Sequence, residues 1–176
     1  MIAPEFSRPV RIDTVGEIPR EIVIEAEQAE RDALARRFGL PGIAKLRAEL
    51  SLVRSDTRLV ATGRLVAEAT QSCVATALPV VANVDQPFEI HFLPHPGADQ
   101  PEEEVELGEE DMDVVFYDGA SIDIGDAVAE TLSLMLDPYP RAPGAEEVLR
   151  QAGVKNEEEA GPFGVLASLR DKLSKK

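Results

Sequence analysis

The sequence has few of the side chains that usually carry out catalysis or hold metals. Among its 176 residues there is one cysteine, Cys73, and there are two histidines, His91 and His95; tryptophan is absent. A lone cysteine excludes an internal disulfide and is typical of a reducing compartment, so we expect a cytoplasmic protein. Zinc sites need four protein ligands, or three and a water, and this pair of histidines is weak evidence for one. We expect Cys73 to be a small packed hydrophobe, because nothing in the sequence places a base beside it.

Other signatures of chemistry or of a membrane are missing as well. No glycine-rich phosphate loop occurs, and the acidic run at residues 102–113 lacks the spacing of a calcium loop. No apolar run is long enough to cross a bilayer, and the first ten residues do not have the pattern of a secretory signal. We therefore expect no enzymatic activity, no metal, no cofactor and no membrane contact. A magnesium-dependent nuclease that uses the many carboxylates is the enzyme alternative.

Basic residues are missing from the middle of the chain. Residues 65–140 contain no Lys or Arg but hold 17 of the 33 acidic residues. The net charge of −15 therefore comes entirely from this span. Direct, nonspecific nucleic-acid binding requires clustered Lys and Arg, whereas opposite potentials steer a basic protein toward an acidic one. The charge favours a basic protein partner, and the plainer alternative is that acidity only keeps the protein soluble.

Alternating residues indicate an antiparallel sheet. Between residues 44 and 52, and again between 59 and 69, every second residue is apolar or glycine and most of the others are polar. Such alternation predicts two strands with one buried face, and the turn at residues 55–57 makes them a hairpin. We expect further strands at residues 80–84, 88–92 and 114–117, and short extended pieces before residue 26.

Helical spacing appears in two places. Residues 27–38 predict a helix capped by Gly39 and ended by Pro41, and a second helix is expected from Ile124 to Leu136, with Asp123 as its N-cap. We expect the second helix to pack on the buried face of the sheet. The fold class is therefore α+β, a mainly antiparallel sheet with packed helices, and closure toward a barrel-like form is an alternative to an open sheet.

The rest of the chain predicts a loop and a tail. Residues 94–113 hold nine acidic residues and few apolar ones, so we expect a mobile loop. We expect a single α+β domain at residues 1–142. Residues 143–176 would form a tail, with a turn or two of helix near residues 146–152 and a short amphipathic helix at the end.

Three motifs, in order along the chain, resemble the YceD family of large ribosomal RNA subunit accumulation proteins. They are Cys73 with Thr76, where many members have Cys-x-x-Cys; IDIGDAVAETLSLMLDPYPR; and GPFGVLASLRDKL. The resemblance implies a bacterial factor in the synthesis, processing or stability of large-subunit ribosomal RNA, without catalytic residues to transfer. Thr76 departs from the pattern, and this argues against a structural zinc because a hydroxyl is a poor zinc ligand.

Two surfaces are candidate binding sites. In the first hypothesis a basic partner, a ribosomal protein or an assembly factor, is steered by the acidic loop and bound by the C-terminal helix. Its residues are Glu102, Glu103, Glu104, Glu109, Glu110, Phe163, Leu166 and Leu169. The alternative is direct binding of ribosomal RNA by arginines of the hairpin. These residues are Arg47, Arg54, Arg58 and Arg64.

Overall fold

The computed structural model describes residues 4–56, 58–95 and 114–154. In chain order these residues form β1 (Pro9–Arg11), the 3-10 turn η1 (Ile12–Thr14), β2 (Arg20–Glu25), α1 (Gln28–Phe38), β3 (Gly42–Ser55), β4 (Arg58–Ser72), β5 (Pro79–Pro94), β6 (Val114–Tyr117), β7 (Ser121–Asp123), α2 (Ile124–Met135) and α3 (Ala145–Gln151). The α+β class is confirmed. The acidic run and the C-terminal helix of the sequence analysis lie outside the described residues.

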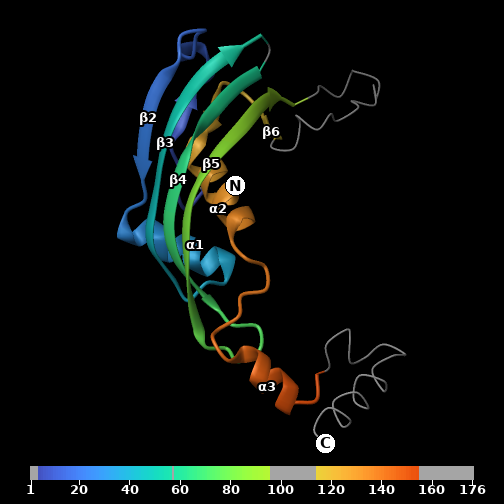
Figure 1. Ribbon diagram of the computed structural model, residues 1–176. Coiled ribbons are helices and arrows are strands. Elements are labelled where there is room, and N and C mark those ends of the chain that lie inside the picture. The colour runs from blue at the N-terminus through green and yellow to red at the C-terminus, as the bar shows by residue number, and fades with distance from the viewer. Residues whose placement is uncertain (1–3, 57, 96–113, 155–176) are drawn as a thin grey trace, which may run out of the picture. The chain divides into compact units, whose positions relative to one another are not determined.

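Five strands form one open sheet in the order β2-β3-β4-β5-β6, seen side by side in Figure 1. The pairs β2–β3 and β3–β4 are antiparallel, and β6 runs parallel to β5. Closure into a barrel was the wrong alternative, because β2 and β6 end the sheet instead of pairing with each other. A second, two-stranded sheet joins β1 to β7.

The predicted hairpin is confirmed as β3 and β4, with one local difference. Leu46, Ala48, Leu50 and Leu52 are buried as expected, but Ala44 is exposed and Ile43 is buried in its place. The register shifts between Ile43 and Lys45, and such a bulge turns the residues before it to the opposite face. The two strands expected at residues 80–84 and 88–92 are one strand, β5.

The main core lies between the inner face of the sheet and the two longer helices. Leu34 and Ala35 of α1 and half of the residues of α2 are buried against it, which confirms that α2 packs on the apolar face of the sheet. The helices are also joined at their surface, since Arg37 of α1 forms ion pairs with Asp126 and Glu130 of α2.

By its internal contacts the chain divides into two compact units. One comprises Met1–Gln71 and Val81–Pro138 and holds the main core, and the other comprises Ser72–Val80 and Tyr139–Lys176. The second has a small cluster of its own around Cys73, Ala142 and Ala145. The division proposed from sequence at residue 142 stays a prediction.

A partly buried ion pair holds the N-terminal segment to α1. The guanidinium of Arg8 donates from Nη1 to Glu30 Oε1 at 2.7 Å and from Nη2 to Oε2 at 2.9 Å. Glu30 Oε2 also accepts from the backbone N–H of Glu27 at 2.7 Å, which completes a capping box at the start of α1. The hydrogen bond from Arg8 lowers the pKa of Glu30 below its ordinary value of 4.5.

This pair predicts a pH dependence of stability. Because the pKa of Glu30 is lowered in the folded protein, its contribution is fully present above pH 4.5 and is lost as the pH falls through the lowered value. Glu30→Gln is therefore expected to lower the free energy of unfolding at pH 7, and this loss should shrink as the pH falls below 4.5. Urea unfolding from pH 7 to below pH 4.5 measures it. Arg8→Gln should remove the same pH dependence of stability. The double variant should be little less stable than either single variant. A constant difference between wild type and Glu30→Gln at every pH would contradict the prediction.

Candidate functional site

The four arginines named as RNA-binding candidates all contact other parts of the protein. Arg54 is structural, because its Nε donates to the Val15 carbonyl at 3.0 Å and its Nη2 to that of Ile12. These bonds fasten the end of β3 to the segment after β1, so this side chain serves the fold. RNA binding by Arg54 stays a prediction.

The other three arginines lie on β3 and β4, and each contacts a carboxylate or an imidazole. Arg47 Nη2 lies 2.6 Å from Glu49 Oε1, and Arg64 Nε lies 2.5 Å from Asp85 Oδ1. Arg58 Nη1 lies 3.4 Å from His91 Nδ1, a ring whose side chain is 13% exposed and whose Nε2 lies 2.8 Å from Glu89 Oε1. The His91 side chain is thus mostly buried and contacts both Arg58 and Glu89.

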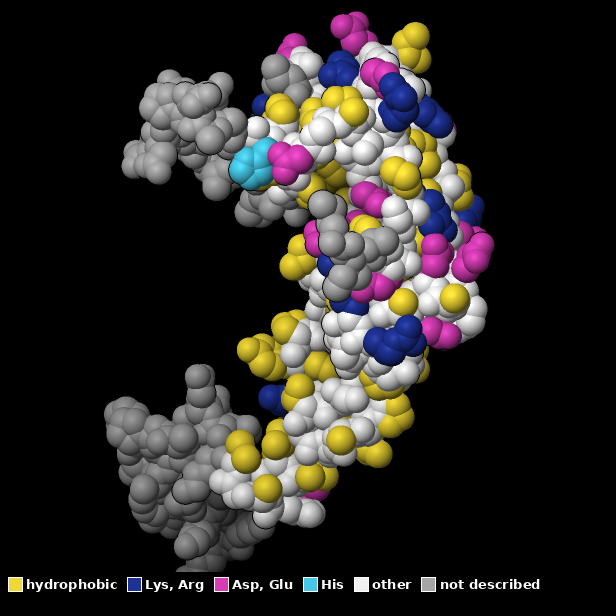
Figure 2. Space-filling model, turned by 180° about the vertical axis from the view of Figure 1, so that it is seen from behind, with side chains coloured by type: hydrophobic (Ala, Val, Ile, Leu, Met, Phe, Trp, Pro, Cys, Tyr) yellow, Lys and Arg dark blue, Asp and Glu magenta, His cyan; other side chains and the backbone are white. Residues whose placement is uncertain are grey.

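The positive charges of Arg47 and Arg64 are thus partly neutralised by carboxylates of the same protein. Figure 2 shows the same mixing on the face in view, where Lys and Arg side chains stand next to Asp and Glu side chains. The pairs of Arg47 and Arg64 are exposed, and ion pairs of this kind are weak enough for a phosphate to compete. RNA binding by the arginine hairpin stays a prediction. The residues proposed for the basic partner, from Glu102 to Glu110 and from Phe163 to Leu169, lie outside the described residues.

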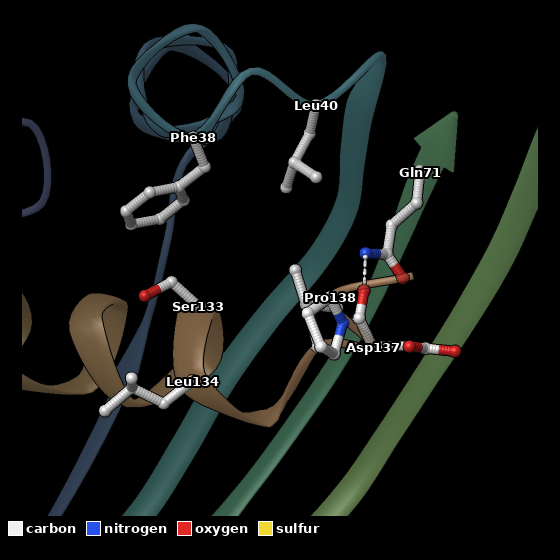
Figure 3. A pocket seen from close by; sticks show the side chains of 8 residues that line it. Phe38, Leu40, Gln71, Ser133, Leu134, Asp137 and Pro138 are labelled. Carbon is white, nitrogen blue, oxygen red and sulfur yellow. Dashed lines mark hydrogen bonds between the residues drawn. The ribbon is translucent and has the colours of Figure 1, made fainter. Parts of the chain in front are cut away.

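A hollow of about 380 Å³ opens beside the C-terminal end of α2. Figure 3 shows Phe38 and Leu40, from the end of α1 and the loop after it, facing Ser133 and Pro138 from the opposite wall. At its edge Gln71 of β4 is 7% exposed and donates from Nε2 to the Asp137 carbonyl at 2.7 Å. That bond fixes the chain where α2 ends, so the hollow has a defined wall.

A second hollow, of about 150 Å³, lies on the other side of α2. Its lining residues come from β5, β6 and α2; they are Ile90, Val114, Val115, Ala127, Glu130, Thr131 and Leu134. Leu134 lines both hollows and is 79% exposed. Each hollow has one charged side chain, and in both it is acidic, Asp137 in the first and Glu130 in the second. We name Leu134 and the two hollows the α2 surface.

The α2 surface is the candidate site that sequence analysis missed. The buried side of α2 is spaced at four-residue steps, Ile124, Val128, Leu132 and Leu136. Leu134 lies two positions after Leu132, which turns it by about 200° from the buried stripe of a helix with 3.6 residues per turn. An apolar residue on the wrong side of an amphipathic helix was the available signal.

The second compact unit holds the thiol. Cys73 is 3% exposed and packs with Ala142 and Ala145, which agrees with its interpretation as a small packed hydrophobe. The pKa of the Cys73 thiol is lowered to about 7 by hydrogen bonds. The backbone of Ala142 makes the largest contribution, and the Thr76 hydroxyl makes the next largest. Within the described ranges no three His, Cys, Asp or Glu side chains group together as metal ligands would.

Fold and surface together define an acidic α+β protein with an open sheet, whose hollows lie along one helix and carry carboxylates. The chain belongs to the YceD family, since the family described as "Large ribosomal RNA subunit accumulation protein YceD" matches residues 61–170. The resemblance read from three motifs is therefore confirmed. The matched span includes most of β4 and all of β5, β6 and α2. No curated protein and no solved structure matches the chain. None of the helices in residues 4–56, 58–95 and 114–154 has the length and apolar character to span a bilayer.

Proposed function

We propose that this protein is a non-catalytic cytoplasmic accessory factor that supports the accumulation of large-subunit ribosomal RNA by binding a basic protein. Membership of the YceD family supports the pathway. The observation that carries the binding step is the α2 surface, where Leu134 is 79% exposed between two hollows that each carry a carboxylate. Contact with the RNA itself is indirect in this proposal.

The chemistry of the α2 surface sets the kind of partner. An exposed leucine between apolar hollows is a suitable anchor point, since full burial of such a side chain contributes about 1.5–3 kcal/mol. No Lys or Arg occurs anywhere in residues 65–140, so the described charge on α2 itself is acidic and Arg37 is the neighbour that partly offsets it. An apolar side chain flanked by Lys or Arg is complementary to this surface. Ribosomal proteins are generally basic, which makes them suitable partners.

Leu134→Asp tests the proposal. The substitution places a charge where the partner's apolar side chain would lie, and we expect recovery of basic large-subunit proteins to fall by about tenfold, the loss of one buried anchor. The measurement is affinity purification of the tagged full chain at low salt, with identification of bound proteins and RNA. Leu134 is 79% exposed, so the variant is expected to unfold at the same temperature as wild type.

Ile18→Asp is the matched control, because Ile18 is 84% exposed and lies outside the α2 surface. It should recover the same proteins as wild type. Two results oppose the proposal: recovery of no basic protein by the wild type, or equal recovery by Leu134→Asp. Crosslinking of ribosomal RNA to the arginine hairpin, lost on substitution of Arg47 and Arg64, would support direct RNA binding instead.

A further inference from the structure

The strand β6 ends the sheet beside the smaller hollow. It pairs with β5 along one side, in the parallel register His91 with Val114 through Pro94 with Tyr117. Among the described residues, no strand pairs with its other side. The hollow of about 150 Å³ lies directly beside it, lined by Val114 and Val115 of the strand and by Glu130 of α2.

The direction of the backbone groups on β6 follows from one hydrogen bond. The Tyr117 carbonyl accepts from His95 N–H at 3.0 Å, so the backbone of Tyr117 faces β5. Backbone direction alternates along a strand, and Val115 therefore also faces β5, whereas Val114 and Phe116 direct their N–H and C=O groups away from the sheet. Within the described residues, no backbone hydrogen bond from the protein occupies those outward groups. An open edge of this kind is a template for an added strand.

Charge selects what can be added. The hollow beside β6 carries Glu130 as its one charged residue, and Arg37 of α1, 3.2 Å from the Glu130 carboxylate, offsets that charge only in part. No Lys or Arg lies on β5, β6 or α2. A segment with Lys or Arg is therefore favoured at this edge, and an acidic one is repelled.

We propose that the basic partner binds in extended form, as a strand added to the free edge of β6. This inference rests on the proposed function and specifies how the partner is held. Its main chain bonds to the outward groups of Val114 and Phe116. Because side chains of a strand alternate, every second residue of the partner lies over α2, where an aliphatic side chain enters the hollow beside Leu134 and a Lys or Arg pairs with Glu130.

Phe116→Pro is the informative substitution, because proline removes an outward N–H and leaves the bonds between β5 and β6 intact. Proline is tolerated on an edge strand when its nitrogen faces solvent. Phe116→Ala is the matched control: it removes the same aromatic ring, which is 51% exposed and lies tilted against the His95 ring, but keeps the N–H. Equal unfolding temperatures of the two variants establish that both are folded.

The probe is a fluorescent eight-residue peptide, Val-Ser-Lys-Ser-Val-Ser-Lys-Ser, in which Val and Lys alternate along one face of a strand, and it is compared with a peptide of the same composition in a helical order. Binding to the full chain is followed by fluorescence anisotropy at low salt. We expect the alternating peptide to bind more tightly than the helical one, and about tenfold more weakly to Phe116→Pro than to Phe116→Ala, for the lost hydrogen bond and the altered edge. Amide exchange at Val114 and Phe116 should slow when the alternating peptide is added to wild type.

Equal binding by Phe116→Pro and Phe116→Ala, preference for the helical peptide, unchanged amide exchange, or no binding at all would overturn strand addition. The proposed function is judged separately by the affinity purification. Loss of basic proteins in Leu134→Asp together with full recovery in Phe116→Pro rejects the extended mode and keeps the basic partner. Failure of wild type to recover any basic protein rejects the proposed function itself.

Discussion

Asp123→Ala is expected to lower the free energy of unfolding by about 3 kcal/mol, the combined cost of a lost helix cap and of buried donors left without a partner. Asp123 Oδ1 accepts from the N–H groups of Gly125 at 3.0 Å and Asp126 at 3.2 Å, which cap α2. The same oxygen accepts from the Arg8 N–H at 2.7 Å, and Oδ2 accepts from the Ser7 hydroxyl. One carboxylate thus joins the start of α2 to the N-terminal segment.

Urea unfolding at pH 7 measures this loss, with the slope of the transition as a check that the same surface is exposed on unfolding. Asp123→Asn is expected to retain part of the stability, because an amide oxygen still caps the helix. Asp13→Ala is a control, since Asp13 pairs with Arg11 at the surface with side chains 58% and 71% exposed, and its midpoint should match that of wild type. An equal midpoint for Asp123→Ala would show that the N-terminal segment is not held by this carboxylate.

Local patterns predicted most of the elements that position the site. The cap at Asp123, the helix after it and the β3–β4 hairpin were all found from residues close together in the sequence. The partners of Asp123 on the far side, Ser7 and Arg8, are more than a hundred positions away. No local spacing reports such a contact, and a short polar segment near a terminus carries no periodicity to mark it.

The errors in the fold have similar causes. A bulge shifts the phase of alternation by one residue, so Ala44 was placed on the buried face by a pattern that holds from Leu46 onward. The single strand β5 was divided because residues 85–87, Asp-Gln-Pro, resemble a turn, and they are exposed within a strand long enough to contain them. Whether the sheet closes depends on its ends, β2 and β6, and the alternation within each strand does not determine how they meet.

The candidate site was predicted less well than the fold. Composition gave the acidic span at residues 65–140, and α2 and β6 both lie in it. The surface itself depends on shape: Phe38 and Leu40 reach it from α1 and the loop that follows, and Gln71 from β4. Only the packed structure brings these three elements around Leu134, so no motif could have named them together.

Gly125→Ala is expected to destabilise the protein by about 2–3 kcal/mol, against the direction that helix propensity alone predicts, about 1 kcal/mol in favour of alanine. Gly125 lies in the first turn of α2, directly under the N-terminal segment. A Cβ there would stand 2.2 Å from the Phe6 carbonyl oxygen and 3.0 Å from Arg8 N. Phe6 is 1% exposed and cannot move without opening the core. The steric term therefore exceeds the propensity term.

Gly42→Ala controls for the entropy of the unfolded chain, since a Cβ at Gly42 meets nothing within 4 Å; urea unfolding should show it equal to wild type or slightly more stable. Displacement of Phe6 and Arg8 by Gly125→Ala also removes the bond from Arg8 to Asp123, so the losses for Asp123→Ala and Gly125→Ala should not add in the double variant. Additive losses would mean that the carboxylate and the glycine act on separate parts of the protein. Sub-additive losses would place both at one junction, where the N-terminal segment holds the start of α2 and, through that helix, the orientation of Leu134.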